Sequence, residues 1–354
     1  MKLFKSLLIA PATLGLLSPI AASANEVTIS DFTPSEQLAI TNSRVDGLEA
    51  RLNNIEAASF SETTTASFSA NFYAGINDDD DAAPNTEDNL MTGYDFGIGL
   101  TTSFTGEDEL AIAIDAGDGD AEGILEFGGD GGGGALTVDE ISYTFPLGDK
   151  ATVVVGDNLG ASTLTTKACV YGTPSDTLDE CGVPNGYIGN DGPMVGISYD
   201  FGNGLTAAAG YAGENADVAN EEGVDGYVLN MAYTADTYAV SLAYGALEDG
   251  AAAPQDNMGV DTFFALNAYF DPEAEGFPSI SVGYENGEDA SVIGNSDGLT
   301  NFMVGLSWDE IGPGSFGIGM GTHTNTVEDT DAQYMYEAYY AYPINDGMTI
   351  TPLI

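Results

Sequence analysis

The sequence predicts an all-β protein, a transmembrane antiparallel β-barrel at residues 63–354 with about 15 strands of an expected 16, preceded by a short coiled-coil helix. In this range apolar or aromatic residues alternate with small or polar ones, segment after segment. The connections between segments are in turn short, as at residues 201–204, and long, as at residues 158–192. Because a barrel that spans a membrane keeps its odd connections on one side and its even ones on the other, this order favours a barrel over a soluble sandwich.

The first 24 residues have the three parts of a secretory signal peptide. Lys2 and Lys5 form a basic start, residues 7–17 are an apolar run, and Ala22 and Ala24 frame a small-x-small cleavage site. A short buried helix is the alternative interpretation. Residues 25–34 follow as a polar lead-in. We therefore expect an exported protein.

Residues 35–58 have the pattern of a coiled-coil helix, which would lie in the periplasm. The apolar positions follow a/d spacing, with Thr41 at the remaining d position: Leu38, Val45, Leu48, Leu52 and Ile55. About three heptads are marginal alone, so we expect a downstream contact that brings chains together. One amphipathic helix packed on its own domain is the alternative.

From residue 63 the period changes from 3.5 to 2. The face opposite the apolar one is too small and polar for a packed sandwich core, and it suits a water-filled lumen. Aromatic residues stand beside the short connections and predict a girdle at the membrane–water interface, in contact with outer-membrane lipid. These residues are Phe104, Phe145, Phe201, Tyr233, Phe270, Trp308 and Tyr342.

The chain is strongly acidic, with 56 Asp and Glu against 6 Lys and Arg and a formal net charge of −50. This balance excludes nucleic acid as a partner, because phosphates need Lys and Arg. Rings of lumenal carboxylates attract cations and repel anions. By strand parity the predicted pore-lining acids are Asp95, Asp115, Glu140, Asp200, Glu285, Asp309 and Glu337.

Residues 43–57, with the run RVDGLEARL and a following Glu56, resemble the cyanobacterial outer-membrane porins, as do Phe60-Ser61 and the first strand at 65–76. That family is grouped with the carbohydrate-selective, OprB-like porins and is often labelled iron-uptake porin. The resemblance implies a 16-stranded barrel in the outer membrane, a homotrimer, a periplasmic helix, and passive diffusion of small hydrophilic solutes and ions, among them nutrients, iron or carbohydrate.

Two features depart from that family. Its members usually carry an S-layer-homology domain between signal and coiled coil, where this chain has only the lead-in at 25–34. The family also ends in a strand that closes on an aromatic residue, whereas this chain ends at Pro352-Leu353-Ile354. We expect a fifteenth strand at 347–354, a missing sixteenth, and an open seam between the first strand and the fifteenth.

The third long connection, at 158–192, carries Cys169 and Cys181. In porins the third loop folds into the barrel and narrows it. An exported protein meets oxidising conditions, so we expect a disulfide, which would contribute about 3 kcal/mol to ordering the loop. The alternative is an external loop in which the disulfide serves only stability. The nearby Lys167 could pair with lumenal acids, contact an anion, or be an ordinary solvated lysine.

No catalytic or cofactor motif stands out. His323 is the single histidine, and the sequence contains no zinc-ligand cluster, P-loop or dinucleotide fingerprint. Clustered acids at 78–81 and 115–120 and the glycines at 128–134 leave weak Ca²⁺ binding in the loops open, without a specific metal site. We therefore expect no enzyme and no cofactor.

Three hypotheses remain for function. The first is a cation-biased porin for small hydrophilic solutes and ions. The second is a structural envelope protein with a plugged barrel that links outer membrane and wall. The third is a secreted acidic calcium-binding β protein, against which the aromatic girdle counts.

Overall fold

In the computed structural model the chain divides into two units, Met1–Ser61 and Glu62–Ile354. The structure describes residues 64–76, 90–119, 134–172, 178, 180–188, 192–213, 224–248, 260–272, 274, 276–289, 297–322, 326–327 and 332–354, all in the second unit. The signal peptide (1–24), the lead-in (25–34) and the coiled-coil helix (35–58) with its core positions Leu38 to Ile55 lie outside these residues. So do the acids at 78–81 and His323.

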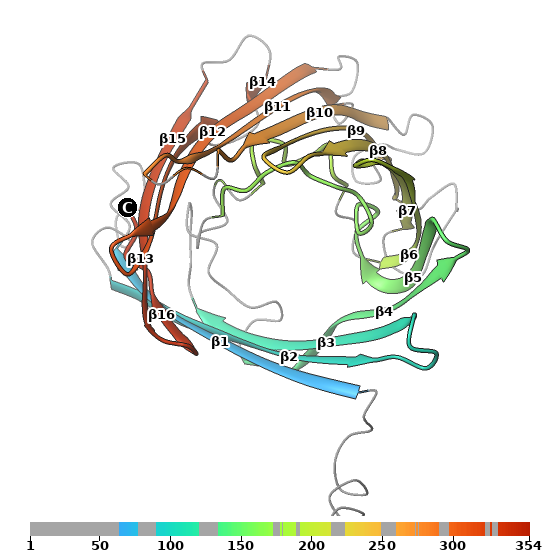
Figure 1. Ribbon diagram of the computed structural model, residues 1–354, viewed down its shortest axis with the longest axis horizontal. Helices are drawn as coiled ribbons and strands as arrows, with labels where there is room; N and C mark the ends of the chain where they lie inside the picture. The colour runs from blue at the N-terminus through green and yellow to red at the C-terminus, as the bar shows by residue number, and fades with distance from the viewer. Residues whose placement is uncertain are drawn as a thin grey trace, which may run out of the picture. The chain divides into compact units, whose positions relative to one another are not determined.

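The second unit is an antiparallel sheet that curves into a ring (Figure 1). Its strands are β1 Thr64–Ile76, β2 Leu90–Thr102, β3 Glu109–Gly119, β4 Thr137–Leu147, β5 Ala151–Leu159, β6 Gly192–Gly202, β7 Leu205–Gly213, β8 Asp225–Thr234, β9 Tyr238–Glu248, β10 Val260–Phe270, β11 Ser279–Asp289, β12 Asp297–Ile311, β13 Gly314–Thr322, β14 Thr326–Val327, β15 Tyr334–Asn345 and β16 Met348–Ile350.

Each strand pairs with its neighbour in sequence, except that the short β14 pairs with β12 beside the main path, which runs from β13 to β15. The predicted all-β antiparallel barrel is therefore confirmed, with fifteen strands along the path. Within the described ranges we find no helical segment with the length and apolar character that crossing a bilayer requires.

The segment after residue 347 pairs with β15 beyond the three residues of β16. A bridge joins Tyr339 to Leu353, and Ala338 and Ile354 exchange backbone hydrogen bonds of 2.8 and 2.9 Å. Among the described strands, β1 and β16 form the two ends of the path and are not hydrogen-bonded to each other.

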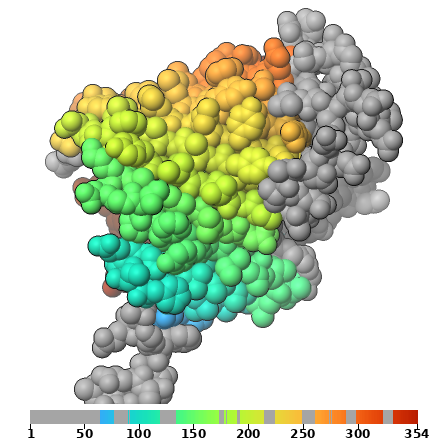
Figure 2. All heavy atoms as spheres, turned by 90° about the vertical axis from the view of Figure 1, so that its right-hand side faces the viewer, coloured from blue at the N-terminus to red at the C-terminus, as the bar shows by residue number. Residues whose placement is uncertain are grey.

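Successive side chains of a strand point to opposite faces of the sheet, and residues paired across neighbouring strands point to the same face. The sheet therefore has two chemically different faces. On β8 the outward side chains Leu229 and Met231 are exposed, whereas the inward Val228, Asn230 and Ala232 are buried. In Figure 2 the outer side chains of neighbouring strands form one continuous surface, coloured in chain order from cyan to orange.

The predicted girdle residues all lie at the short-turn ends of their strands. Each stands within or next to one of the connections β2–β3, β4–β5, β6–β7, β8–β9, β10–β11, β12–β13 and β15–β16. Five of them are exposed, namely Phe104, Phe201, Tyr233, Phe270 and Tyr342, and Phe145 and Trp308 are half-buried. Their girdle role is a proposal that this placement supports.

Candidate functional site

The described residues of the connection between β5 and β6, namely 160–172, 178 and 180–188, lie inside the ring of strands (Figure 1). Of its described residues many are buried, among them Ala161, Tyr171, Cys181, Val183 and Ile188. We call these described residues the inner loop. Since its apolar side chains pack against Val228, Phe263 and Met303 of the wall, the loop is internal rather than an external stapled segment.

Polar wall side chains bond the backbone of the inner loop, and we call them the polar track: Asn230 of β8, Ser241 of β9, Asn267 of β10 and Ser281 of β11. The N–H of Thr166 donates to Asn230 Oδ1 at 2.9 Å, and Asn230 Nδ2 returns a bond to the Thr166 carbonyl at 3.1 Å. Ala168 N–H donates to Ser241 Oγ at 2.9 Å. These bonds satisfy loop backbone that no ladder covers.

The track continues on β10 and β11. Ser281 Oγ accepts the N–H groups of Val170 and Tyr171, both at 3.0 Å. Asn267 Nδ2 donates to the carbonyl of Cys181 at 3.1 Å. The first arm of the loop is thus bonded to β8, β9 and β11, and the second arm returns across β10.

Glu285 of β11 anchors that second arm. Its carboxylate accepts the N–H groups of Asn185 (3.0 Å) and Gly186 (2.5 Å), and the side-chain amides of Asn185 (2.6 Å) and Asn301 (3.1 Å). Its exposed fraction is 0 %. The prediction that Glu285 lines the pore is therefore wrong, because strand parity gives the inward face but not the loop that covers it.

The prediction that Glu337 of β15 lines the pore is wrong for the same reason. It is 5 % exposed, and its Oε1 accepts the hydroxyl of Tyr171 at 2.9 Å. Burial raises the pKa of Tyr171, and the nearby Glu337 carboxylate raises it further. Glu337 therefore secures the loop instead of facing the solution.

Inward glycines allow the loop to lie this close to the wall. A Cβ at Gly283 would meet the Cys181 carbonyl, and a Cβ at Gly210 would meet the Ala161 carbonyl. The ring of Tyr171 lies over Gly305. In the sequence these glycines indicate only a small-residue lumenal face, so their docking role could not be found there.

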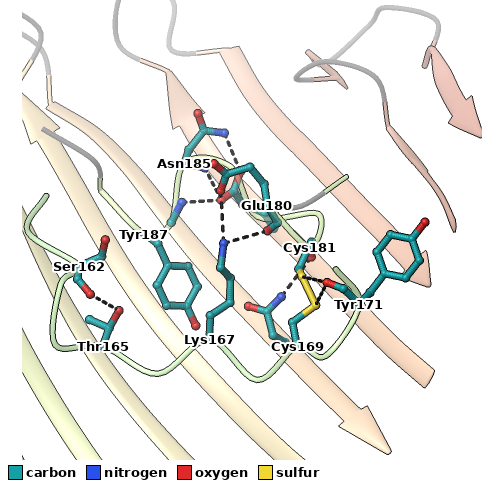
Figure 3. Close-up of polar contacts among 12 residues, drawn as sticks. Ser162, Thr165, Lys167, Cys169, Tyr171, Glu180, Cys181, Asn185 and Tyr187 are labelled. Atoms are coloured by element: carbon teal, nitrogen blue, oxygen red, sulfur yellow. Dashed lines mark hydrogen bonds and ion pairs between the residues drawn. A yellow bond between two sulfur atoms is a disulfide. The ribbon is translucent and has the colours of Figure 1, made fainter. Parts of the chain in front are cut away.

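The two cysteines form a disulfide inside the loop. Cys169 and Cys181 are bonded across a sequence separation of 12, with a Cα–Cα distance of 6.5 Å, within the usual range for a disulfide. The bond joins the two arms of the loop (Figure 3).

Lys167 pairs within its own loop rather than with a wall acid. Its Nζ lies 3.4 Å from Glu180 Oε2 and 5.6 Å from the centre of the Tyr187 ring (Figure 3). That ring is fixed, since the Tyr187 hydroxyl lies 3.0 Å from Ser241 Oγ and donates to the Thr166 carbonyl at 3.2 Å. Burial raises the pKa of Tyr187.

Three of the predicted lumenal acids lie on neighbouring strands. Asp95, Asp115 and Glu140 are on the inward face of β2, β3 and β4, and we call them the acid wall. A one-residue bulge in β4 pairs Glu140 with Ala113 and keeps it on this face.

All three acids are half-buried and take hydrogen bonds from neutral donors only, Asn71, Thr137 and Ser142 respectively, at 2.7–2.8 Å. Strands β2 and β3 lie across the ring from β10 and β11, on which the loop rests (Figure 1).

The remaining predicted acids, Asp200 and Asp309, are exposed at the short-turn ends of β6 and β12. Asp200 Oδ1 accepts the N–H of Gly202 and so caps its own turn. Among the described residues no three His, Cys, Asp or Glu side chains are grouped as a metal site requires.

Comparison with known proteins gives similarity in fold. The chain matches no known family profile. It is 24 % identical to an uncharacterized protein of Nostoc sp. strain PCC 7120, over 98 % of this chain and 70 % of that one.

Solved structures with a similar fold are outer-membrane porins. OmpT of Vibrio cholerae, in a trimer form, matches with a TM-score of 0.54 at 13 % identity, covering 82 % of this chain and 88 % of OmpT. OprB of Pseudomonas putida matches with 0.56 at 11 % identity, covering 81 % and 88 %. A variant of the Rhodopseudomonas blastica porin matches with 0.52 at 12 % identity, covering 82 % and 93 %. The barrel with its inner loop has the porin fold.

Proposed function

We propose that this protein is an outer-membrane porin through which small hydrophilic solutes and inorganic ions diffuse passively, with a preference for cations. The observation that carries the proposal is the inner loop, which is fixed to one side of the lumen by the polar track, Glu285 and Glu337. A loop held against one wall narrows a pore without filling it.

The outer surface supports a membrane location. Large apolar side chains, among them Val195, Leu229, Leu242 and Val282, are exposed on the outward face of successive strands. Lipid is the solvent that would cover such a band, and the aromatic residues at the short-turn ends suit its interface. The short turns would then face the periplasm, and the trimer state known for OmpT is a proposal for this chain.

The acid wall supports the preference for cations. Carboxylates at a narrow place attract cations and exclude anions. Iron and sugars, which the resemblance implies as cargo, stay proposals of the same kind, and a structural envelope protein with a plugged barrel is the alternative.

Reconstitution into planar bilayers tests the proposal. The protein, purified from a host without its own general porins, should give stepwise conductance and a reversal potential of cation-selective sign in a KCl gradient. Protein from the same host carrying the empty vector is the control. Absence of channels would favour the plugged barrel, and an anion-selective channel would refute the cation preference.

A further inference from the structure

We infer that Lys167 and Glu180, held together by the Cys169–Cys181 disulfide, form a charge-compensated pair, so that the inner loop does not oppose the cation selectivity that the acid wall gives to the pore. The inference rests on the proposed function and adds how the inner loop affects its selectivity. Glu180 cancels the charge of Lys167, so that ions passing the inner loop meet the acid wall on one side and no net positive charge on the other.

The first support is the distribution of bases. Of the lysines in the described part of the chain, Lys150 stands in the β4–β5 turn and donates to the Phe201 carbonyl at 3.3 Å. Lys167 is in the inner loop. A single uncompensated charge there would oppose the field of the acid wall, so its partner decides how the constriction acts on ions.

The second support is exposure. The side chains of Lys167 and Glu180 are 30 % and 48 % exposed, whereas Glu285 and Glu337 are covered. The pair therefore faces the solution in the lumen. An exposed ion pair of this kind contributes at most about 1 kcal/mol to stability. Its effect on the electrostatic field in the lumen therefore matters more here than its contribution to folding.

The third support is the fixed placement of both residues. Lys167 lies between Thr166 and Ala168, whose backbone is bonded to the polar track. Glu180 precedes Cys181, which is held by the disulfide and by Asn267. Lys167 Nζ also lies 3.5 Å from the Glu180 carbonyl oxygen. The disulfide therefore brings Glu180 to Lys167 (Figure 3).

The test compares charge variants by reversal potential in a KCl gradient. Glu180→Gln leaves Lys167 uncompensated and should lower the permeability ratio of K⁺ to Cl⁻ by about twofold, which is the combined, opposite effect on the two ions of one charge about 8 Å away in water, screened over about one Debye length. Lys167→Met should raise the ratio by about the same factor. The double exchange Lys167→Glu with Glu180→Lys should restore the wild-type ratio.

The disulfide is tested in the same assay. Cys169→Ser with Cys181→Ser should lower the ratio in the wild-type background and leave it unchanged in the Glu180→Gln background, because the compensation is already lost there. Glu107→Gln in the β2–β3 turn removes an equal charge outside the lumen and is the matched control, expected to leave the ratio unchanged. Heat-shifted migration on gels verifies that each variant is folded.

Several outcomes would overturn the inference. One is an unchanged K⁺ to Cl⁻ permeability ratio in both single charge variants. Another is a double exchange whose ratio stays at the Glu180→Gln value, since the change in ratio would then come from altered loop structure and not from charge. These outcomes leave a conducting wild type and so spare the proposed function. A wild type without any conductance refutes both.

Discussion

At the scale of single residues, the carboxylates of this acidic chain differ by the donors around them. Asp108, just before β3, accepts hydrogen bonds from the backbone of Phe104 and Thr105, the hydroxyls of Ser103 and Thr105, and the Tyr143 hydroxyl at 2.6 Å. The Tyr143 hydroxyl, followed by the bonds from Thr105 and Ser103, holds the pKa of Asp108 well below its usual range, although burial opposes this. Such an acid holds the β2–β3 connection in shape through its bonds to the backbone.

Asp108→Asn should lower the stability of the refolded barrel at pH 7, because an amide presents N–H groups where donors converge. A pKa lowered by folding gives stability that is present above the pKa of unfolded Asp, about 3.9, and is lost as the pH falls towards the folded value. The difference in urea midpoint between wild type and Asp108→Asn should therefore be smaller at pH 3 than at pH 7.

Glu107→Gln, next to Asp108 and exposed, is the control and should change little at either pH. An equal effect of both variants, or a difference in midpoint independent of pH, would contradict this account of Asp108.

At the scale of elements, the inner loop and the inward face of β7–β15 fit each other. The wall offers glycines where the loop backbone or the Tyr171 ring comes close, and polar side chains where loop backbone groups need partners. The disulfide limits the spread of the two arms. In the proposed porin, a loop held in this way would keep the pore width fixed against thermal motion.

Gly283→Ala should displace the second arm of the loop, because the added Cβ meets the Cys181 carbonyl. Overpacking of this kind costs about 1–3 kcal/mol. We expect faster amide hydrogen exchange in residues 180–188 and a broader distribution of single-channel conductance.

Gly97→Ala on β2 is the matched control, since its Cβ would meet only the end of the Ser69 side chain, at 3.0 Å. Exchange in the loop should stay at the wild-type rate in this variant. If Gly283→Ala behaved like Gly97→Ala, close packing of loop on wall would not be what fixes the loop.

At the scale of the whole molecule, the formal charge of −50 says little about the pore by itself. Two of the acids predicted to line it are covered by the loop, and Asp200 and Asp309 lie at the short-turn ends. The acid wall remains, with the compensated Lys167–Glu180 pair in the inner loop. In the proposed porin, ion selectivity would thus depend on a few positions inside the ring.

Neutralising the acid wall should reduce the preference for cations. Each unit charge about 8 Å from the ion, screened over about one Debye length, is worth about 0.2 kcal/mol with opposite sign for K⁺ and Cl⁻, or about a factor of two in their permeability ratio. The triple variant Asp95→Asn, Asp115→Asn, Glu140→Gln should therefore lower the K⁺ to Cl⁻ permeability ratio several-fold, as measured by reversal potential. Asp309→Asn, at the short-turn end of β12, should lower this ratio less. If it lowered the ratio as much as the triple variant does, the selective region would lie at the short-turn end of the barrel instead of at the acid wall.

Local sequence patterns predicted the barrel for a physical reason. A strand between lipid and water must alternate apolar and polar side chains. Neighbouring residues therefore indicate the apolar face, the short turns with their aromatic residues, and the inward orientation of Asp95, Asp115 and Glu140. The sequence thus determined the antiparallel order of the strands and which side chains point inward.

Tertiary structure decided what covers the inward face. Glu285 and Asp95 have the same parity, but only Glu285 is buried, because a loop about a hundred residues away in the sequence donates its N–H groups to it. Lys167 finds Glu180 through the disulfide and not through sequence spacing. Such contacts depend on where the chain returns in space, and no local period carries that information.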